Sequence, residues 1–452
     1  MARRRRSAAR TSGLKPAQII LIGFLAAICV GTLLLMLPVS SAAGTWTSLA
    51  DALFTATSAT CVTGLVVQNT ATYWSTFGQV VILCLIQIGG MGVITFLVAF
   101  SMLVGQRVSL RRRWIMQESI SAPHVGGILG QTRFIITTSA AIELVGAALL
   151  AVRFVPEFGV GRGLWYALFH SVSAFCNAGF DLLGYEEEFA SLTAYGSDPY
   201  VLVVVATLVV VGGIGFLTWG DIREHGTHFR RYSLQTKLVL VTTAALLAFG
   251  FCFFMYEFSL PQWSELTLGE RVLSAVFQTV TPRTAGFNAV DLTNLSEAGQ
   301  LVTIVLMLIG CSPGSTAGGF KVTTLAVLVM STFATFRGKR HVETRHRRIA
   351  TRVQRNATAV FMLYLTLFVG AGLVICCVDG VSLMEALFEA ASAVATVGLS
   401  LGITPGLSLV SRTVLVCLMY LGRAGGLTMM YALVERDEGY KSKYPQEPVA
   451  VG

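Results

Sequence analysis

Four short segments of the chain share one pattern: small or β-branched residues, then a glycine, then a bulky apolar residue. They are TCVTGL (60–65), CNAGF (176–180), RTAGF (283–287) and ATVGL (395–399). Successive glycines lie 115, 107 and 112 positions apart: Gly64, Gly179, Gly286 and Gly398. Backbone carbonyls can replace the water shell of a monovalent cation, and glycine tolerates the backbone angles that turn them inward. The pattern therefore predicts a cation filter built from four backbone segments.

A four-fold internal repeat lets one chain surround a single pore, as four identical subunits do in a potassium channel. We expect each segment to contribute its small residues and its glycine. The expected filter residues are Thr60, Cys61, Val62, Thr63 and Gly64; Cys176, Asn177, Ala178 and Gly179; Arg283, Thr284, Ala285 and Gly286; and Ala395, Thr396, Val397 and Gly398.

The composition indicates what must position these segments. Of the 452 residues, 54% are hydrophobic and only 13% are charged, with a mean hydropathy of +0.69. Soluble globular proteins carry about 25% charged residues. Apolar runs of the roughly 20 residues needed to cross a bilayer recur along the chain. The chain is therefore predicted to be an all-α polytopic membrane protein, and a soluble enzyme is excluded.

Each repeat is expected to contain a membrane helix, a short pore helix, a filter segment and a returning membrane helix. The expected repeats are 16–104, 134–220, 238–336 and 357–434. The returning helices are expected at 77–104, 200–219, 299–336 and 408–434. The pore helices would direct their partly negative C-termini at the cavity and favour a cation there. Eight spanning helices and four half-membrane hairpins result.

The returning helices carry a second repeated mark, a glycine cluster: IGGMG (88–92), VGGIG (211–215), IGCSPG (309–314) and LGRAGG (421–426). These clusters follow the filter glycines by 25, 33, 24 and 24 residues. Small residues alone also let any membrane helices pack closely. Their matched offsets from four filter segments favour a true repeat.

The third returning segment has a feature that the others lack. As one straight helix its 38 residues would span about 57 Å, against a hydrocarbon core of about 30 Å. Its centre is rich in helix breakers, which predicts two half-helices joined by a gate loop of Cys311, Ser312, Pro313, Gly314, Ser315, Thr316, Ala317, Gly318 and Gly319. A kinked helix without a moving part is the alternative. A phosphate-binding loop is disfavoured, because Phe320 separates Gly319 from Lys321.

Three ionisable residues of the expected membrane and pore helices are candidates for a special role. Arg423, in the fourth glycine cluster, is costly there and is a functional candidate. It could form an electrostatic barrier, pair with a carbonyl of the gate loop, or serve packing alone. Glu143 could pair with Arg423 or face a neighbouring helix. His170, in the second pore helix, is expected to be a structural hydrogen-bonding group rather than a proton relay.

The net charge of +9 is distributed as the positive-inside rule requires, not as a nucleic-acid surface. Basic residues gather in the N-terminus and in three connections, and acidic or neutral connections such as 181–198 alternate with them. This predicts cytoplasmic segments at 1–15, 105–133, 221–237, 337–356 and 435–452. The basic connections serve as topology signals or as a docking surface for a cytosolic partner. No cleavable signal is expected, because the apolar run at 16–36 is too long.

Catalytic chemistry is not indicated. Histidines, carboxylates and cysteines do not gather at motif spacing in the membrane segments, and the nine cysteines are expected to be small buried hydrophobes rather than disulfides or metal ligands. The chain is therefore not expected to be an enzyme or to carry a covalent cofactor.

The four filter segments, the GCSPGSTAGGFK loop and the LGRAGGLT segment together resemble the KtrB/TrkH/HKT superfamily of potassium transporters, over residues 16–434. The length is closest to the KtrB membrane subunit. The resemblance implies that the four glycines determine K⁺ preference, since serine at the place of Gly64 favours Na⁺. It also implies that the loop is an intramembrane gate with Arg423 beneath it. One departure is Gly426, where the family often has proline.

The same resemblance implies a homodimer with one pore in each protomer, docked on a cytosolic KtrA-like ring of nucleotide-binding subunits. The predicted function is a pore-forming subunit that conducts K⁺ inward across the bacterial cytoplasmic membrane, with both termini cytoplasmic. A sodium-preferring or unselective cation transporter of the same architecture is the alternative, and activation by Na⁺ is left open. A secondary solute transporter is disfavoured, because those usually repeat twice in inverted topology.

Overall fold

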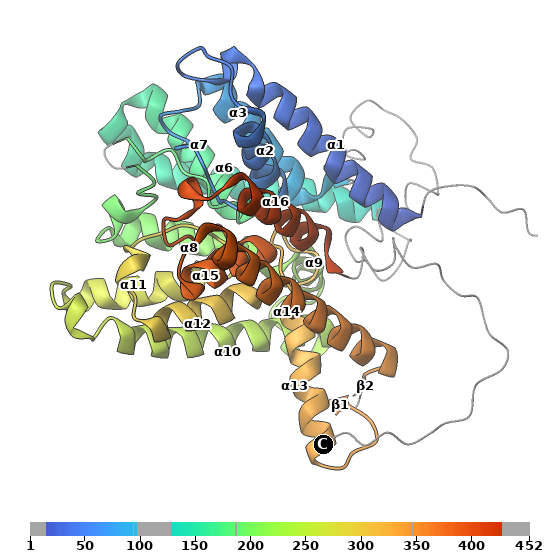
Figure 1. The fold of residues 1–452 in the computed structure, drawn as a ribbon. Helices are drawn as coiled ribbons and strands as arrows, with labels where there is room; N and C mark the ends of the chain where they lie inside the picture. Colours follow the sequence, from blue (N-terminus) through green and yellow to red (C-terminus); the bar gives the residue numbers. More distant parts are fainter. Residues whose placement is uncertain (1–14, 94, 97–127, 186–187, 345–346, 427–452) are drawn as a thin grey trace, which may run out of the picture.

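The structure is a computed structural model that describes residues 15–93, 95–96, 128–185, 188–344 and 347–426. Four of its helices are long and apolar enough to cross a membrane. They are α1 (Pro16–Met36), α6 (Ile128–Phe158), α10 (Leu234–Glu257) and α14 (Thr351–Asp379). Each begins one of the four expected repeats, and most of the molecule is helical (Figure 1).

A shorter helix follows each of these four and packs against it. These pore helices are α2 (Leu49–Cys61), α7 (Val160–Cys176), α11 (Leu268–Val280) and α15 (Leu383–Ala395). Hydroxyl side chains at Ser48, Thr267 and Ser382 cap three of them, and the last two complete a capping box with a glutamate. These caps satisfy backbone N–H groups that a helix start leaves unpaired. All four pore helices lie within a few residues of their expected positions.

The returning helices are α3 (Thr76–Met91), α8 (Pro199–Ile214), α12 (Glu297–Leu308) and α16 (Leu409–Ala424). The expectation of unbroken helices over 77–104, 200–219 and 408–434 was wrong. α3, α8 and α16 each end at a glycine, and α8 meets α9 (Phe216–His225) at a bend of 89°. Residues 97–104 and 427–434 lie outside the described part of the chain. The third returning segment is divided into α12 and α13 (Val322–Phe336), as expected.

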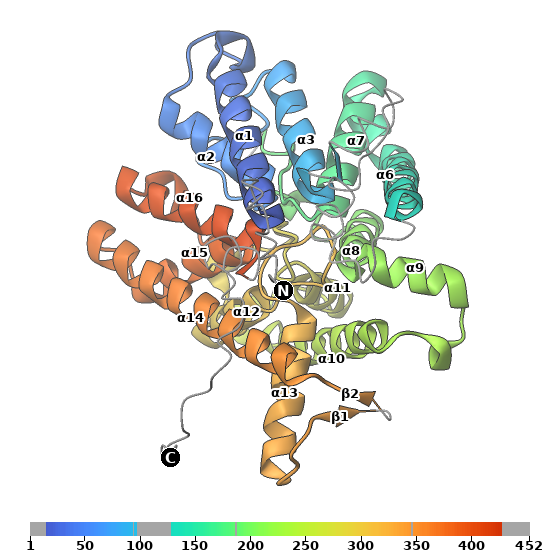
Figure 2. The same ribbon diagram turned by 90° about the vertical axis from the view of Figure 1, so that its right-hand side faces the viewer.

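The four units follow one another around a common centre (Figure 2). Each returning helix contacts the pore helix of the next unit: α3 contacts α7, α8 contacts α11, and α12 contacts α15. α16 contacts α2 of the first unit, so the series closes on itself. A single chain thus encloses a central axis with the ends of its pore helices gathered around it.

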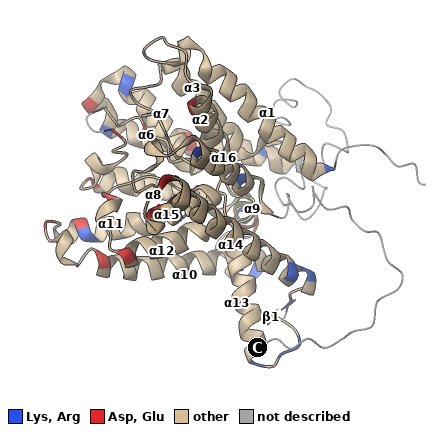
Figure 3. Cartoon of the chain, in the orientation of Figure 1, with Lys and Arg blue, Asp and Glu red and all other residues tan. Residues whose placement is uncertain are grey.

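One end of the bundle carries a small β-hairpin that we did not predict. β1 (Glu343–Thr344) pairs antiparallel with β2 (Arg347–Arg348) after α13, within the expected basic connection 337–356. Lys and Arg residues gather at this end, around α13 and the start of α14 (Figure 3). The expected segment 435–452 and most of the expected segments 1–15 and 105–133 lie outside the described residues. Short 3₁₀ turns occupy Pro38–Ser40, Thr193–Tyr195, Phe229–Arg231, Pro261–Trp263, Leu292–Asn294 and Thr404–Gly406.

Candidate functional site

The four filter segments meet as a closed ring of backbone. A Cβ built on each filter glycine would fall at or within 3.0 Å of a backbone oxygen of the next segment. The oxygens belong to Ala178 for Gly64, Ala285 for Gly179, Val397 for Gly286 and Thr63 for Gly398. In each case the contacted residue directly precedes the next glycine. The last segment thus closes on the first, and a side chain at any of these four positions would press on the backbone of the next segment.

Backbone angles impose the same restriction on these glycines. Their φ values are +93°, +68°, +80° and +95° for Gly64, Gly179, Gly286 and Gly398. Residues with a Cβ seldom adopt such values. Two residues earlier, each segment has a further residue in the left-handed region: Val62, Asn177, Thr284 and Thr396. The repeat seen in residue types is therefore also a repeat in conformation.

Serine hydroxyls behind the ring stabilise three of the four turns. The Oγ atoms of Ser58 and Ser392 accept hydrogen bonds of 3.1 and 3.0 Å from the N–H groups of the filter glycines, Gly64 and Gly398. Ser173 Oγ accepts one of 3.1 Å from the N–H of Phe180. The third segment differs, because Val280 occupies the matching place and α11 ends there.

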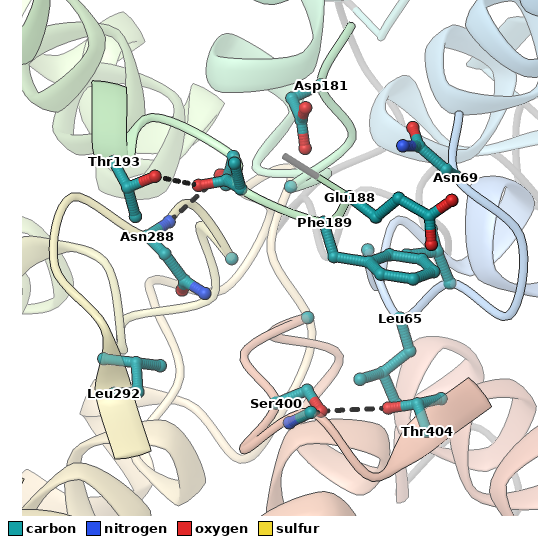
Figure 4. A pocket seen from close by; sticks show the side chains of 18 of the residues that line it. Leu65, Asn69, Asp181, Glu188, Phe189, Thr193, Asn288, Leu292, Ser400 and Thr404 are labelled. Atoms are coloured by element: carbon teal, nitrogen blue, oxygen red, sulfur yellow. Dashed lines mark hydrogen bonds between the residues drawn. The ribbon is translucent and has the colours of Figure 1, made fainter. Parts of the chain in front are cut away.

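A cavity of about 320 Å³ opens on one side of the ring (Figure 4). All four filter glycines line it, together with three carboxylates, Asp181, Glu188 and Asp291, and we call it the acidic pocket. The residue two places after each glycine also lines it: Val66, Asp181, Asn288 and Ser400. Of these four residues, only Asp181 has an ionisable side chain. Burial raises the pKa of the Asp181 carboxyl to about 6, although a hydrogen bond from the Leu183 N–H opposes the shift.

A second cavity, of about 300 Å³, contains basic residues. Lys321 and Arg423 line it with the helix-breaking glycines Gly92 and Gly425, and we call it the basic pocket. Ala317 and Gly319 of the gate loop also belong to its wall. The gate loop therefore forms part of this pocket while it also contacts the filter segments.

Hydrogen bonds close the gate loop at its base. At its base, Gly310 N donates to Phe320 O at 2.9 Å and Val322 N donates to Cys311 O at 3.1 Å. Lys321 Nζ reaches back to the carbonyls of Ala317 and Gly318, at 2.6 and 3.2 Å. These bonds satisfy backbone groups that the break between α12 and α13 leaves unpaired.

The tip of the loop lies against the filter segments. Thr316 Oγ1 lies 3.2 Å from the carbonyl oxygen of Phe175 and 3.2 Å from Asn177 Oδ1. A Cβ on Gly318 would collide with the side chain of Thr396. Cys311 Sγ lies 3.3 Å from the carbonyl oxygen of Arg283. The loop thus contacts the second, third and fourth segments on the side opposite the acidic pocket.

Arg423 contacts the gate loop from the side of the basic pocket. Its Nη1 donates to the Thr316 carbonyl, and its Nη2 donates to the carbonyls of Gly89 and Gly90. Pairing with a loop carbonyl, one of its expected roles, is therefore present. The Gly89 and Gly90 carbonyls belong to the last turn of α3, where the partly negative end of a helix favours a cation.

The other ionisable candidates have separate partners. Glu143 accepts hydrogen bonds of 3.0 Å from Gln87 Nε2 and does not pair with Arg423. His170 Nε2 accepts from the Leu182 N–H at 3.3 Å, so its Nδ1 donates to the Tyr166 carbonyl at 2.7 Å. His170 is the structural group that we expected, and it ties the second pore helix to the residues after its filter segment.

Arg283 differs from the other filter residues because its side chain is charged and buried. Its Nη2 lies 3.5 Å from Thr243 Oγ1 of α10, and its guanidinium also approaches Cys311 Sγ. The side chain therefore packs behind the third segment, toward α10 and the gate loop.

The glycine clusters form the joints between returning helices and pore helices. A Cβ on Gly89, Gly212 or Gly422 would collide with the carbonyl oxygen at the end of a pore helix: Thr60, Phe175 or Val394. Three residues later the helix breaks at Gly92, Gly215 or Gly425, with φ of +84°, +93° or +82°. Arg423 occupies the place that Gly90 and Gly213 occupy in the first two units. Close packing was one interpretation of these clusters, but the breaks were not predicted.

Sequence reasoning also missed the acidic pocket. Its carboxylates come from separate connections after the second and third filter segments, and only the position of Asp181, directly after the second segment, could have indicated it.

The arrangement has counterparts among known proteins. A family model described as TrkH, a cation transport protein, matches residues 7–441. The chain belongs to this family. The NtpJ potassium/sodium uptake protein of Enterococcus hirae is 38% identical over 97% of this chain and 98% of its own length. The Ktr system potassium uptake protein B of Bacillus subtilis is also 38% identical, over 97% of each chain.

The crystal structure of the potassium transporter TrkH from Vibrio parahaemolyticus has the same fold. It matches with a TM-score of 0.73 at 18% identity, covering 95% of this chain and 87% of that one. As a member of the TrkH family, the protein is a membrane cation transporter and not an enzyme.

Proposed function

We propose that this TrkH-family protein is the pore-forming subunit of a potassium uptake system. The observation that carries the proposal is the closed ring of four glycine segments, with a pocket on one side and the gate loop on the other. Ktr system potassium uptake proteins B, at 38% identity over nearly the full chain, support K⁺ as the cation.

The proposed path runs from the acidic pocket through the ring to the basic pocket. Carboxylates at the entrance raise the local concentration of cations. In the ring, backbone carbonyls of the four segments replace water around a dehydrated K⁺. A membrane potential that is negative inside supplies about 2.3 kcal/mol per charge for each 100 mV, so no chemical step is needed.

The gate loop, Cys311–Gly319, is the proposed barrier to flow. Thr316 and Gly318 lie against the second and fourth segments, and Arg423 donates to the loop from the side of the basic pocket. The Arg423 charge on the far side of the ring also opposes a cation that leaves the filter. Conduction then requires the loop to move away from the ring.

We further propose that the basic pocket and the β1/β2 hairpin face the cytoplasm. The basic connections carry the charge that the positive-inside rule assigns to that side. Among the described residues, Lys and Arg gather around α13 and the start of α14 (Figure 3). The protein would then be a multi-pass protein of the bacterial cytoplasmic membrane with both termini inside. The names of the Ktr relatives support a system of more than one component. From the family resemblance we propose a homodimer docked on a KtrA-like nucleotide-binding ring.

A second candidate function is sodium or unselective monovalent cation transport. The NtpJ relative is named a potassium/sodium uptake protein, which favours keeping Na⁺ as a substrate or an activator in the tests.

The deciding experiment measures Rb⁺ and Na⁺ uptake by purified protein in liposomes under an imposed membrane potential. Rb⁺ entry that K⁺ suppresses and Na⁺ does not suppress supports the potassium function. Equal or greater Na⁺ entry supports the alternative. Replacing Gly286 by Ser should weaken the preference for Rb⁺, because the new side chain meets the Val397 backbone. Gly161→Ser, at a position with no atom near a new Cβ, is the matched control.

A further inference from the structure

Asn177 is chemically distinct from its counterparts in the ring. The left-handed residue before each filter glycine is valine or threonine in the other three units: Val62, Thr284 and Thr396. Asn177 alone carries a carboxamide, which both donates and accepts hydrogen bonds. Its side chain is fully buried at the ring. A buried amide is retained only where its hydrogen bonds are made, so its partners are informative.

The partners of Asn177 belong to two other parts of the site. Its Oδ1 lies 3.2 Å from Thr316 Oγ1 of the gate loop. Its Nδ2 lies 3.5 Å from the Arg283 carbonyl and 3.5 Å from Thr284 Oγ1, both in the third filter segment. One side chain therefore joins the second segment, the third segment and the loop.

Thr316 is held from two directions. Its hydroxyl meets Asn177 and the Phe175 carbonyl at the end of the second pore helix, while its own carbonyl accepts from Arg423. A displacement of the loop that separates Thr316 from Arg423 also removes the hydroxyl from Asn177. The gate loop therefore cannot move away from the ring without changing the hydrogen bonds of a filter residue.

We propose that Thr316 and Asn177 form a latch that couples the position of the gate loop to the geometry of the filter, which makes Asn177 a specificity-determining residue. This inference rests on the proposed potassium function. When the loop leaves, Asn177 Oδ1 loses its donor and the amide turns to a new partner, which shifts its contacts with the third segment. Gly179 and Gly286 are in backbone contact, so the shift reaches the ring. Discrimination between K⁺ and Na⁺ depends on how the carbonyls are arranged around the ion.

The test replaces the two halves of the latch. Thr316→Val removes the hydroxyl and keeps the shape, and Thr316→Ser restores the hydroxyl. Asn177→Thr installs the residue that the third and fourth segments carry at this place. Thr332→Val is the matched control, because Thr332 Oγ1 donates to Leu328 O within α13, outside the gate loop. Each variant is reconstituted as the full chain, and Rb⁺ and Na⁺ uptake are measured together.

We expect Thr316→Val to raise Rb⁺ uptake and to lower the Rb⁺/Na⁺ uptake ratio by about threefold to tenfold, the effect of one hydrogen bond. Thr316→Ser and Thr332→Val should keep the wild-type ratio. Asn177→Thr should lower the ratio similarly, and the double variant with Thr316→Val should change it no further than the larger single effect.

An unchanged ratio in Thr316→Val, with higher uptake, would overturn the latch and leave the loop as a simple barrier. Additive effects in the double variant would also overturn it. If Thr316→Val does not fold, Asn177→Thr alone decides, since an unchanged ratio there removes the specificity role. Failure of the proposed function is separate, because it appears in the wild-type protein as the absence of a preference for Rb⁺.

Discussion

The third returning segment differs from its three counterparts in how its helix is interrupted near the ring. In the first, second and fourth units, the returning helix ends at one glycine, and a second glycine packs against the pore helix. In the third unit the break extends from Ile309 to Lys321, and Gly310 packs against the Gly318 carbonyl of the loop itself. The loop occupies space between the returning helix and the ring.

This difference separates a pseudo-symmetric frame from the loop that we propose as its movable part. The three glycine joints are backbone packed on backbone, and they cannot open without creating a void. The loop is held to the ring by Thr316 and to α3 by Arg423, through hydrogen bonds that can break and re-form. Substitutions should therefore divide into those that damage the frame and those that release the loop.

The largest effect is expected at a joint. Gly422→Ala would place a Cβ against the Val394 carbonyl, where neither backbone can yield. We expect a loss of folding stability of about 3 kcal/mol, at the upper end for overpacking, seen as a lower unfolding temperature of the purified protein. Gly220→Ala, where a Cβ meets no atom within 4 Å, should leave that temperature unchanged. Equal stability of the two variants would contradict the rigid-joint interpretation.

The next effect is expected at the hydrogen bonds beneath the loop. Arg423→Ala removes donors to Thr316 and to the end of α3. Hydrogen bonds to a charged group contribute about 1.5–3 kcal/mol, so Rb⁺ uptake should rise by about tenfold or more. Arg423→Lys keeps the charge but loses the two separate Nη donors of the guanidinium, and should give an intermediate rise in Rb⁺ uptake. A lower unfolding temperature without higher uptake would assign Arg423 to packing alone.

A smaller effect is expected within the loop. Gly318→Ala would push against the Thr396 side chain, which can rotate, so the loop rather than the frame should move. We expect uptake to rise by about threefold to fivefold, or roughly 1 kcal/mol, with an unfolding temperature close to wild type. Uptake at the wild-type level together with a loss of stability would place Gly318 among the rigid joints.

The smallest effect on uptake is expected in the acidic pocket, where one carboxylate departs from the four-fold pattern. Asp181 has uncharged counterparts in the other units, and burial raises its pKa to about 6. It is therefore mainly ionised at pH 7.5 and mainly neutral at pH 5. A charge about 8 Å from a cation in water-like surroundings contributes about 0.5 kcal/mol, so uptake at low K⁺ should fall about twofold between these pH values. Asp181→Asn should remove that step, and a step that persists in this variant would assign it to another group.

Much of this arrangement could be predicted from residue types, because the repeat appears in the local pattern. The pore helices lie within three residues of their expected starts, and the split of the third returning segment follows from the breakers between Gly310 and Gly319. The helix breaks at Gly92, Gly215 and Gly425 were missed, since a glycine in an apolar helix is equally consistent with close helix packing.

The remaining features depend on contacts between distant parts of the chain. The acidic pocket combines carboxylates from different connections, each of which looks like an ordinary solvated residue in its own segment. The contact between Asn177 and Thr316 joins two units, and nothing near either residue indicates the other. Such pairs become visible only when the ring has been assembled.

The contact between Gly398 and the Thr63 carbonyl has a consequence for the biogenesis of the protein. Because the first and last segments complete the ring, the filter cannot exist while the ribosome is still making the fourth unit. A nascent chain with three units inserted lacks one wall of the conduit. Completion of the ring is therefore a late event in biogenesis, and it requires the fourth unit to return to the first across the whole length of the chain.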